Sequence, residues 1–131
     1  MNGLRIFVTE DFHDFMTDSK LSEKDILKSA HELANGLFDA DLSGNIYKKR
    51  IAPTGRSKSG FGRAIVAFRF EDKIFYIDGW LKHSVRKNGP EIPDKLLSLY
   101  KAIAKDLLNF TEQQLEIELR TGLIKEVISN G

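Results

Sequence analysis

The sequence predicts an α+β protein with a twisted, mainly antiparallel sheet, two N-terminal helices on one face of it, and a helical C-terminal extension over residues 93–128. Two early segments and two late ones repeat apolar residues with the period of a helix, whereas the middle of the chain alternates with the two-residue period of strands. Short turns separate these middle segments, as in antiparallel hairpins. A length of 131 residues predicts a single domain over 1–131, long enough to bury a core without disulfide or metal staples.

The N-terminal third is predicted to form a strand and two helices. Residues 4–8 are an apolar run of strand type, after which Thr9 or Asp11 can cap a short helix. A second helix is expected to start at Ser22, with Asp25 three residues later completing an approximate capping box. Gly36 suits the C-terminal end of this helix. The apolar positions of the second helix are Ile26, Leu27, Ala30, Leu33, Ala34 and Leu37.

The central third is predicted to form a strand, a glycine-rich loop and a hairpin. In the strand over 46–52, alternation places Tyr47, Lys49 and Ile51 toward the core and the residues between them on the open face. The loop covers 53–62, and a two-residue turn at Glu71 and Asp72 joins strands 63–70 and 73–80. The predicted cross-strand pairs are Phe68 with Phe75, Val66 with Ile77, Ile65 with Asp78, and Arg63 with Trp80. Asp78 is expected to pair with a neighbouring basic residue.

The C-terminal third is predicted to be helical with one short final strand. Asp94 is expected to cap an amphipathic helix that runs to Leu108. Thr111 opens a second helix over 112–119, which Gly122 ends. Residues 123–128 are expected to form the last strand.

Composition excludes several classes of function. The chain has no cysteine, which removes thiol catalysis and cysteine-based zinc sites and fits a reducing compartment. The N-terminus becomes acidic before any long apolar run, so neither a signal peptide nor a membrane span is expected, and a cytoplasmic protein is the default. No nucleophile elbow, phosphate-binding loop or histidine pair at metal spacing is present, so neither a metal nor a cofactor is expected.

Positive charge is concentrated in one stretch of an almost neutral chain. The net charge is +1, yet no acidic residue lies between Asp41 and Glu71. Such an island predicts a site for an anion. The simpler alternative is a solvated hairpin edge, on which lysine prevents edge-to-edge aggregation. The basic residues of the island are Lys48, Lys49, Arg50, Arg56, Lys58, Arg63 and Arg69.

Lysine and arginine can bind a phosphodiester and stabilise the extra negative charge of its transition state. On RNA the substrate itself supplies the nucleophile, a 2′-hydroxyl, so that a lysine of lowered pKa can act as base and a second cation as acid. Lys82 and His83 follow a strand end, where side chains are held firmly and reach solvent. Trp80 can either stack with a base or cover Arg63. The same face could equally bind RNA without cutting it.

Three stretches in this order resemble the RelE/HigB-type toxins of type II toxin-antitoxin modules. These are LANGLFDADLSGNIYKKRIA, then SKSGFGRAIVAFRFEDKIFYIDGWLKHS, then AKDLLNFTEQQLEIEL followed by LIKEV. The resemblance covers roughly residues 32–127 and implies a RelE-like fold. It also implies a ribosome-dependent, metal-free endoribonuclease that cuts mRNA and is neutralised by a cognate antitoxin, expected to be a helix-turn-helix protein.

The residues that match the family's motifs are Lys48, Lys49, Arg50, Lys58, Arg63 and Lys82. Arg63 becomes the principal transition-state stabiliser, and the other catalytic candidates are Lys48, Arg50, Lys58 and Lys82. The expected RNA-binding residues are Lys49, Arg56, Arg69, Trp80 and His83. The chain departs from the family pattern at SKSGFGR, which replaces GKSGGYR, and at GWLKH, which replaces GFAK. The alternative is a non-nucleolytic protein of the RelE/ParE fold, with a gyrase-type target or only an antitoxin as partner.

Overall fold

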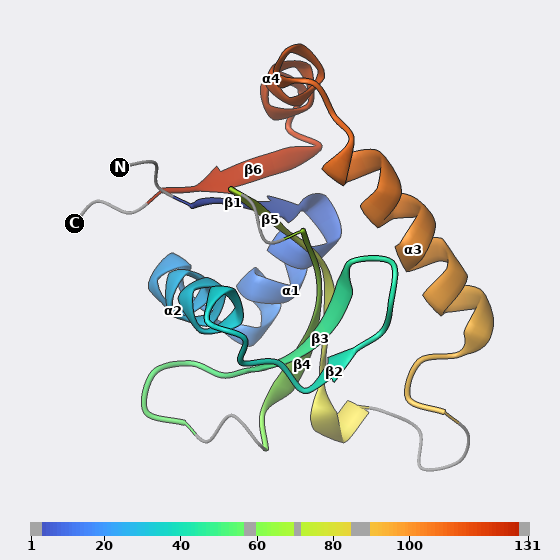
Figure 1. Ribbon diagram of the computed structural model, residues 1–131. Helices are drawn as coiled ribbons and strands as arrows, with labels where there is room; N and C mark the ends of the chain where they lie inside the picture. The colour runs from blue at the N-terminus through green and yellow to red at the C-terminus, as the bar shows by residue number, and fades with distance from the viewer. Residues whose placement is uncertain (1–3, 57–59, 70–71, 85–89, 129–131) are drawn as a thin grey trace.

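The computed structural model describes residues 4–56, 60–69, 72–84 and 90–128. It has an α+β fold with a mostly antiparallel sheet, as predicted (Figure 1). The strands are β1 (Arg5–Thr9), β2 (Ala40–Asp41), β3 (Ile46–Ile51), β4 (Gly62–Phe68), β5 (Lys73–Leu81) and β6 (Ile124–Val127). The helices are α1 (Glu10–Ser19), α2 (Glu23–Ala34), α3 (Asp94–Leu108) and α4 (Glu112–Thr121), with a 3₁₀ turn, η1 (Lys82–Ser84).

The six-stranded sheet has the order β2-β3-β4-β5-β1-β6. Its neighbouring strands are antiparallel except for β1 and β5, which run parallel. The first strand of the chain therefore lies inside the sheet, between β5 and β6. The strands that carry the basic island, β3 and β4, lie toward the opposite edge from β6.

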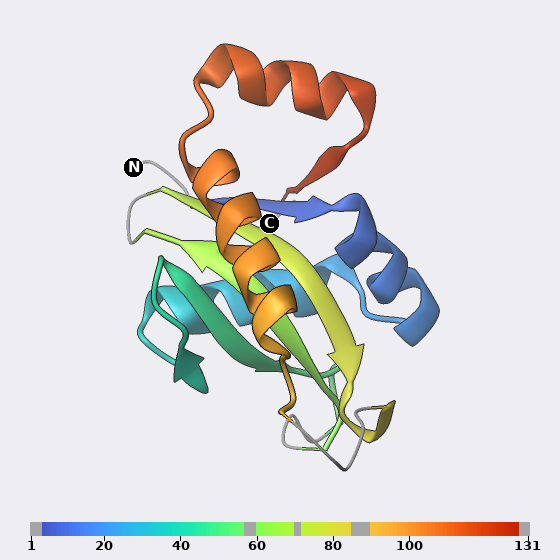
Figure 2. The ribbon, with the colours of Figure 1, turned by 90° about the vertical axis from the view of Figure 1, so that its right-hand side faces the viewer.

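Helices cover both faces of this sheet. The N-terminal helices α1 and α2 pack on one face, as predicted, around buried residues such as Phe12, Ile26 and Tyr76. Helix α3 crosses the other face, where Tyr100 packs with residues of the sheet such as Ile65 (Figures 1 and 2). The sequence predicted this second face to be open; α3 covers part of it, because its apolar side also needs a surface on which to be buried.

The helix ends follow local sequence signals in most places. Thr9 accepts a hydrogen bond from the backbone of Phe12, and complete capping boxes form at Ser22 with Asp25 and at Thr111 with Gln114. Two details were predicted wrongly. Helix α3 has Pro93 rather than Asp94 at its N-cap, and α2 ends at Ala34, so that Leu37 lies beyond it and is 57% exposed.

A β-bulge changes the predicted hairpin register. Arg63 opposes Trp80 and Ile65 opposes Asp78, as predicted, but Val66 opposes Tyr76 and Phe68 opposes Ile74. The shift lies between Ile65 and Val66, where β5 holds one extra residue, Ile77. The predicted pairs Phe68 with Phe75 and Val66 with Ile77 are therefore wrong. Glu71, half of the predicted turn, lies outside the described residues.

The bulge determines which side chains of β5 face α3. Before it, Tyr76 lies among the residues buried under α1 and α2. After it, Trp80 packs on the α3 side and Asp78 accepts a hydrogen bond from Tyr100 of α3. An unbroken two-residue alternation would have placed Tyr76, Asp78 and Trp80 on one face. The bulge therefore puts Asp78 and Trp80 on the opposite face from Tyr76.

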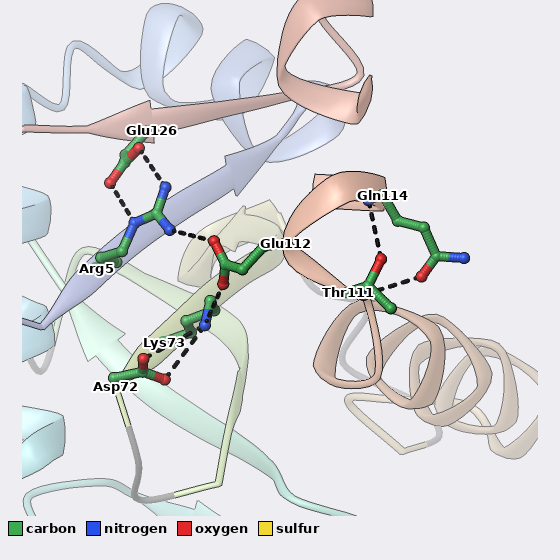
Figure 3. Close-up of polar contacts among 7 residues, drawn as sticks. All are labelled: Arg5, Asp72, Lys73, Thr111, Glu112, Gln114 and Glu126. Atoms are coloured by element: carbon green, nitrogen blue, oxygen red, sulfur yellow. Dashed lines mark hydrogen bonds and ion pairs between the residues drawn. The ribbon is translucent and has the colours of Figure 1, made fainter. Parts of the chain in front are cut away.

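A network of ion pairs connects α4 and β6 to strands β1 and β5 (Figure 3). Arg5 of β1 donates two hydrogen bonds of 3.0 Å to Glu126 of β6 and one of 3.1 Å to Glu112 of α4. Lys73 of β5 lies 3.0 Å from the same Glu112. The network therefore joins α4 to β1 and β5 and joins β1 to β6.

Within the described part of the chain, no helix is both long and apolar enough to span a bilayer.

Candidate functional site

Three cations of the basic island and one indole gather at one end of the sheet, on the face that α3 partly covers. Arg50 of β3 and Arg63 of β4 are direct cross-strand partners, and Arg63 is in turn the partner of Trp80 on β5. Lys48 lies two residues before Arg50 and so on the same face. We call Lys48, Arg50, Arg63 and Trp80 the basic cluster.

Asp39 binds the two arginines of the cluster. Its Oδ1 lies 3.2 Å from Nε of Arg50, and its Oδ2 lies 3.5 Å from Nε of Arg63. Like charges directly opposite each other on neighbouring strands repel, and a carboxylate that contacts both removes this repulsion. The position of Asp39 is fixed by its own backbone, whose N–H donates to the carbonyl of Lys48 at 2.8 Å.

Arg63 is more deeply buried than a residue on an open face. Only 7% of the residue is exposed, and its Nη1 also donates to the carbonyl of Gly62 at 3.0 Å. The sequence placed Arg63 on the correct face but expected that face to be open. A guanidinium keeps its charge when buried, so it needs the partners that Asp39 and the Gly62 carbonyl provide.

Glu91 binds the other half of the cluster. Its Oε1 lies 2.8 Å from Nζ of Lys48, and its Oε2 accepts a 3.4 Å hydrogen bond from the indole N–H of Trp80. Burial alone would raise the pKa of Glu91, but the hydrogen bond and charge of Lys48, with smaller effects from Trp80 and Arg63, lower it below its ordinary value. Glu91 is therefore an anion at neutral pH.

Among the described residues, Asp78 pairs with Tyr100 and not with the neighbouring base that was predicted. It accepts hydrogen bonds from the hydroxyl of Tyr100 and from the backbone of Gly79. The reason is that α3 crosses this face and places Tyr100 beside β5. Burial and then the Asp78 carboxylate raise the pKa of the Tyr100 phenol, which therefore stays protonated at neutral pH.

Lys49 lies on the opposite face from the cluster. Its side chain is 5% exposed and lies 2.9 Å from Glu32 of α2, so its predicted core-facing orientation is confirmed. Arg69 is exposed just beyond β4, at the far end of the strand from Arg63. The structure therefore does not bring these two candidate RNA-binding residues to the basic cluster.

The remaining candidates lie near the cluster's end of the sheet. Lys82 and His83 are exposed in η1, directly after β5, and the N–H of Lys82 donates to Phe61 just before β4. Arg56 lies over the ring of Phe61, 5.4 Å from its centroid. A hollow of about 120 Å³ between α2 and the end of β3 is lined by Arg50, Arg56 and Lys28, and also by the carboxylates of Asp25 and Glu32. Lys58 lies outside the described residues.

Sequence reasoning identified the cations of this site but missed the carboxylates. Asp39 precedes the basic island by several residues, and Glu91 lies beyond the hairpin, in a segment that reads only as a polar connection. The absence of acids within the island gave no sign that distant acids would be brought to it. Among the described residues, no group of three or more histidine, aspartate or glutamate side chains lies close enough together to hold a metal ion.

The fold and the site define a class, namely small α+β proteins with a cationic cluster at one end of a mostly antiparallel sheet. A family model described as the RelE toxin of the RelE / RelB toxin-antitoxin system matches residues 4–127. The chain therefore belongs to the RelE toxin family and is a toxin of a toxin-antitoxin system. Its fold is RelE-like, and toxins of this family pair with antitoxins. A search of curated proteins found no match.

Proposed function

We propose that this toxin is an endoribonuclease that cuts mRNA on the ribosome and so inhibits translation. The observation that best supports the proposal is the pair of Arg50 and Arg63, which lie opposite each other on adjacent strands and share the carboxylate of Asp39. Charged donors held rigidly on strands stabilise a transition state without having to reorganise. Arg63 is the more firmly held of the two, and we assign it the principal role at the scissile phosphate.

The chemistry requires no nucleophile from the protein. The 2′-hydroxyl attacks the adjacent phosphorus, the bond from phosphorus to the 5′-oxygen breaks, and the products are a 2′,3′-cyclic phosphate and a 5′-hydroxyl. Lys48 and Arg50 bind the phosphate, and Arg63 stabilises the charge of the transition state. One group must remove the 2′ proton and another must protonate the 5′-oxygen. Lys82, His83 and Lys58 are the candidates for these transfers.

Around this centre we assign RNA binding to Arg56 and Trp80. Arg56 lies over the ring of Phe61, the residue that precedes β4, and Trp80 is the cross-strand neighbour of Arg63. The proposed setting is the cytoplasm, with mRNA in the ribosome as substrate. The proposed neutralising partner is a helix-turn-helix antitoxin.

The test is primer-extension mapping of a translated mRNA after brief expression of the wild type and of Arg63→Lys. The substitution keeps one positive charge but loses the guanidinium contacts with Asp39 and Gly62. We expect cleavage within codons by the wild type and a loss of about 100-fold in the variant, the usual cost of removing one preorganised donor. Lys125→Ala, an exposed change on β6, is the control and should cleave normally.

Two further measurements make the test decisive. Thermal unfolding of purified Arg63→Lys shows whether the variant is folded, which matters because Arg63 is buried. Blocking translation should abolish the cuts if the ribosome is required. Wild-type cleavage that persists in Arg63→Lys would remove Arg63 from its proposed role. Growth arrest with intact transcripts would favour a non-nucleolytic RelE/ParE-fold protein with a gyrase-type target, or one whose only partner is its antitoxin.

A further inference from the structure

The two carboxylates of the site are held in different ways. Asp39 directly precedes β2, its backbone bonds to β3, and its side chain is 18% exposed between two arginines. Glu91 lies in the segment between η1 and α3, outside any helix or strand, and its side chain is 29% exposed. Asp39 is thus attached to the sheet by its backbone, whereas Glu91 reaches the cluster from a connecting segment.

Glu91 makes the contacts that a phosphate would make. Its two oxygens accept from an ammonium at 2.8 Å and from an indole N–H at 3.4 Å, and Arg63 adds a favourable charge nearby. A phosphate monoanion also offers oxygen acceptors and a negative charge to such donors. The groups that hold Glu91 therefore form an anion subsite, and in this structure a side chain of the protein fills it.

We propose that Glu91 is an intramolecular competitor for an RNA phosphate, and that a backbone phosphate binds between Nζ of Lys48 and Nε1 of Trp80 by displacing it. The proposal rests on the proposed function, because it assumes that the natural ligand of the cluster is RNA. It adds a phosphate subsite that includes an indole N–H. It also gives the two carboxylates opposite roles, since Asp39 positions the arginines while Glu91 must leave.

The exposure of the two pairs supports this division. Lys48 and Glu91 have side chains that are 24% and 29% exposed, so water and salt screen their attraction more than they screen the contact between Asp39 and the more buried Arg63. The side chain of Arg63 is 9% exposed, and removing Asp39 would leave a buried charge without one of its partners. An arriving phosphate therefore replaces Glu91 at a lower cost than it would replace Asp39, which stays in place.

The test measures binding and not cleavage. The probe is a short single-stranded oligoribonucleotide with 2′-O-methyl riboses, which cannot be cut because it has no free 2′-hydroxyl. Glu91→Gln removes the competing charge and keeps the size of the side chain. We expect its affinity for the probe to be roughly fivefold higher than that of the wild type, the effect of one unit charge at contact distance in water.

Glu116→Gln is the matched control. It makes the same change in net charge on an exposed residue of α4, where Glu116 pairs with Arg120 one helical turn later. A local competitor predicts that the control binds like the wild type. Adding Lys48→Ala to Glu91→Gln should remove the gain, because the subsite has lost its ammonium. Asp39→Asn should weaken binding, because its arginines lose the group that positions them.

Equal affinity of Glu91→Gln and the wild type would overturn the inference, as would an equal gain in Glu116→Gln. A gain that survives the added Lys48→Ala would place the competition elsewhere and also overturn it. Failure of the proposed nuclease activity would give a different combination of cleavage and binding results. If wild-type protein leaves transcripts intact but Glu91→Gln tightens binding, the phosphate subsite stands and only the nuclease is lost. Cleavage without any gain in binding means that only the inference fails.

Discussion

Asp25 can be buried as a carboxylate because its two oxygens accept hydrogen bonds from Ser22 and Thr54. One oxygen accepts from the backbone of Ser22 at 2.9 Å, and the other accepts from the backbone and the hydroxyl of Thr54 at 3.0 and 2.8 Å. Burial alone would raise its pKa, but these bonds together lower the pKa below the ordinary value of 3.8. A single side chain thus ties the start of α2 to the turn after β3.

The lowered pKa of Asp25 predicts a specific pH dependence of stability. A carboxylate whose pKa is depressed by folding stabilises the protein above the ordinary pKa, and this stabilisation is lost as the pH falls through the folded pKa. Asp25→Asn should therefore lower the free energy of unfolding by about 2 kcal/mol at pH 7, the usual value for hydrogen bonds to a charged group. The difference from the wild type should shrink below pH 3.8.

Urea unfolding of both proteins across the acid range measures this difference. Ser19→Ala is a useful comparison, because it removes a hydroxyl that donates to the carbonyl of Phe15 at the end of α1, without removing a titrating group. A difference between wild type and Asp25→Asn that stays constant down to the lowest pH would show that the charge of Asp25 contributes nothing.

At the scale of the elements, helix α2 is attached to β3 by a charged contact as well as by apolar packing. Lys49 points away from the basic cluster and contacts Glu32 of α2 at 2.9 Å. Its neighbour Lys48 points to the cluster and contacts Glu91. Alternation along one strand thus gives two adjacent lysines different surroundings, one structural and one at the candidate site.

The two lysines should respond oppositely to the same substitution. Lys49→Met should lower the free energy of unfolding by about 3 kcal/mol, because it leaves a poorly solvated glutamate without its lysine. Its RNA affinity should stay within about twofold of the wild type, because a residue on the α2 face cannot reach the ligand. Lys48→Met should cost little stability and weaken RNA binding. Urea unfolding measures the change in stability, and fluorescence anisotropy with the uncleavable RNA measures the change in affinity. Reduced RNA affinity in a stably folded Lys49→Met would contradict the placement of Lys49 away from the RNA.

The parts of the fold that could be predicted from the sequence are those with local causes. The capping boxes at Ser22 and Thr111 involve residues three positions apart, and the alternation of β3 is visible within six residues. The bulge at Ile77 and the passage of α3 over the sheet depend on packing between distant segments. For the same reason, the sequence identified Lys48, Arg50 and Arg63 as a set but not Glu91, which tertiary structure alone brings to Lys48.

For the molecule as a whole, the arrangement of charge matters more than its sum. The net charge is only +1, so attraction to RNA must come from the basic cluster and the cations beside it. A single-stranded ligand that is neutralised by three cations should show a slope of about −2 when the logarithm of affinity is plotted against that of salt concentration. Anisotropy titrations at several salt concentrations measure this slope.

Removing one lysine of the basic cluster should change this slope by a defined amount. Lys48→Ala should make the slope shallower by about 0.7, the share of one phosphate contact. Lys125→Ala, on the far edge of the sheet, should leave the slope unchanged. A wild-type slope several times steeper than −2 would mean that RNA covers a much larger surface than the basic cluster.

The position of β1 inside the sheet has a consequence for the folding of the protein during its synthesis. β1 pairs with β5 on one side and with β6 on the other, and these partners come from residues 73–81 and 124–127 (Figure 1). Contacts of such long sequence separation form late and slowly. A nascent chain therefore cannot close its sheet until β6 has left the ribosome, and during synthesis it exposes the edge of an unfinished sheet.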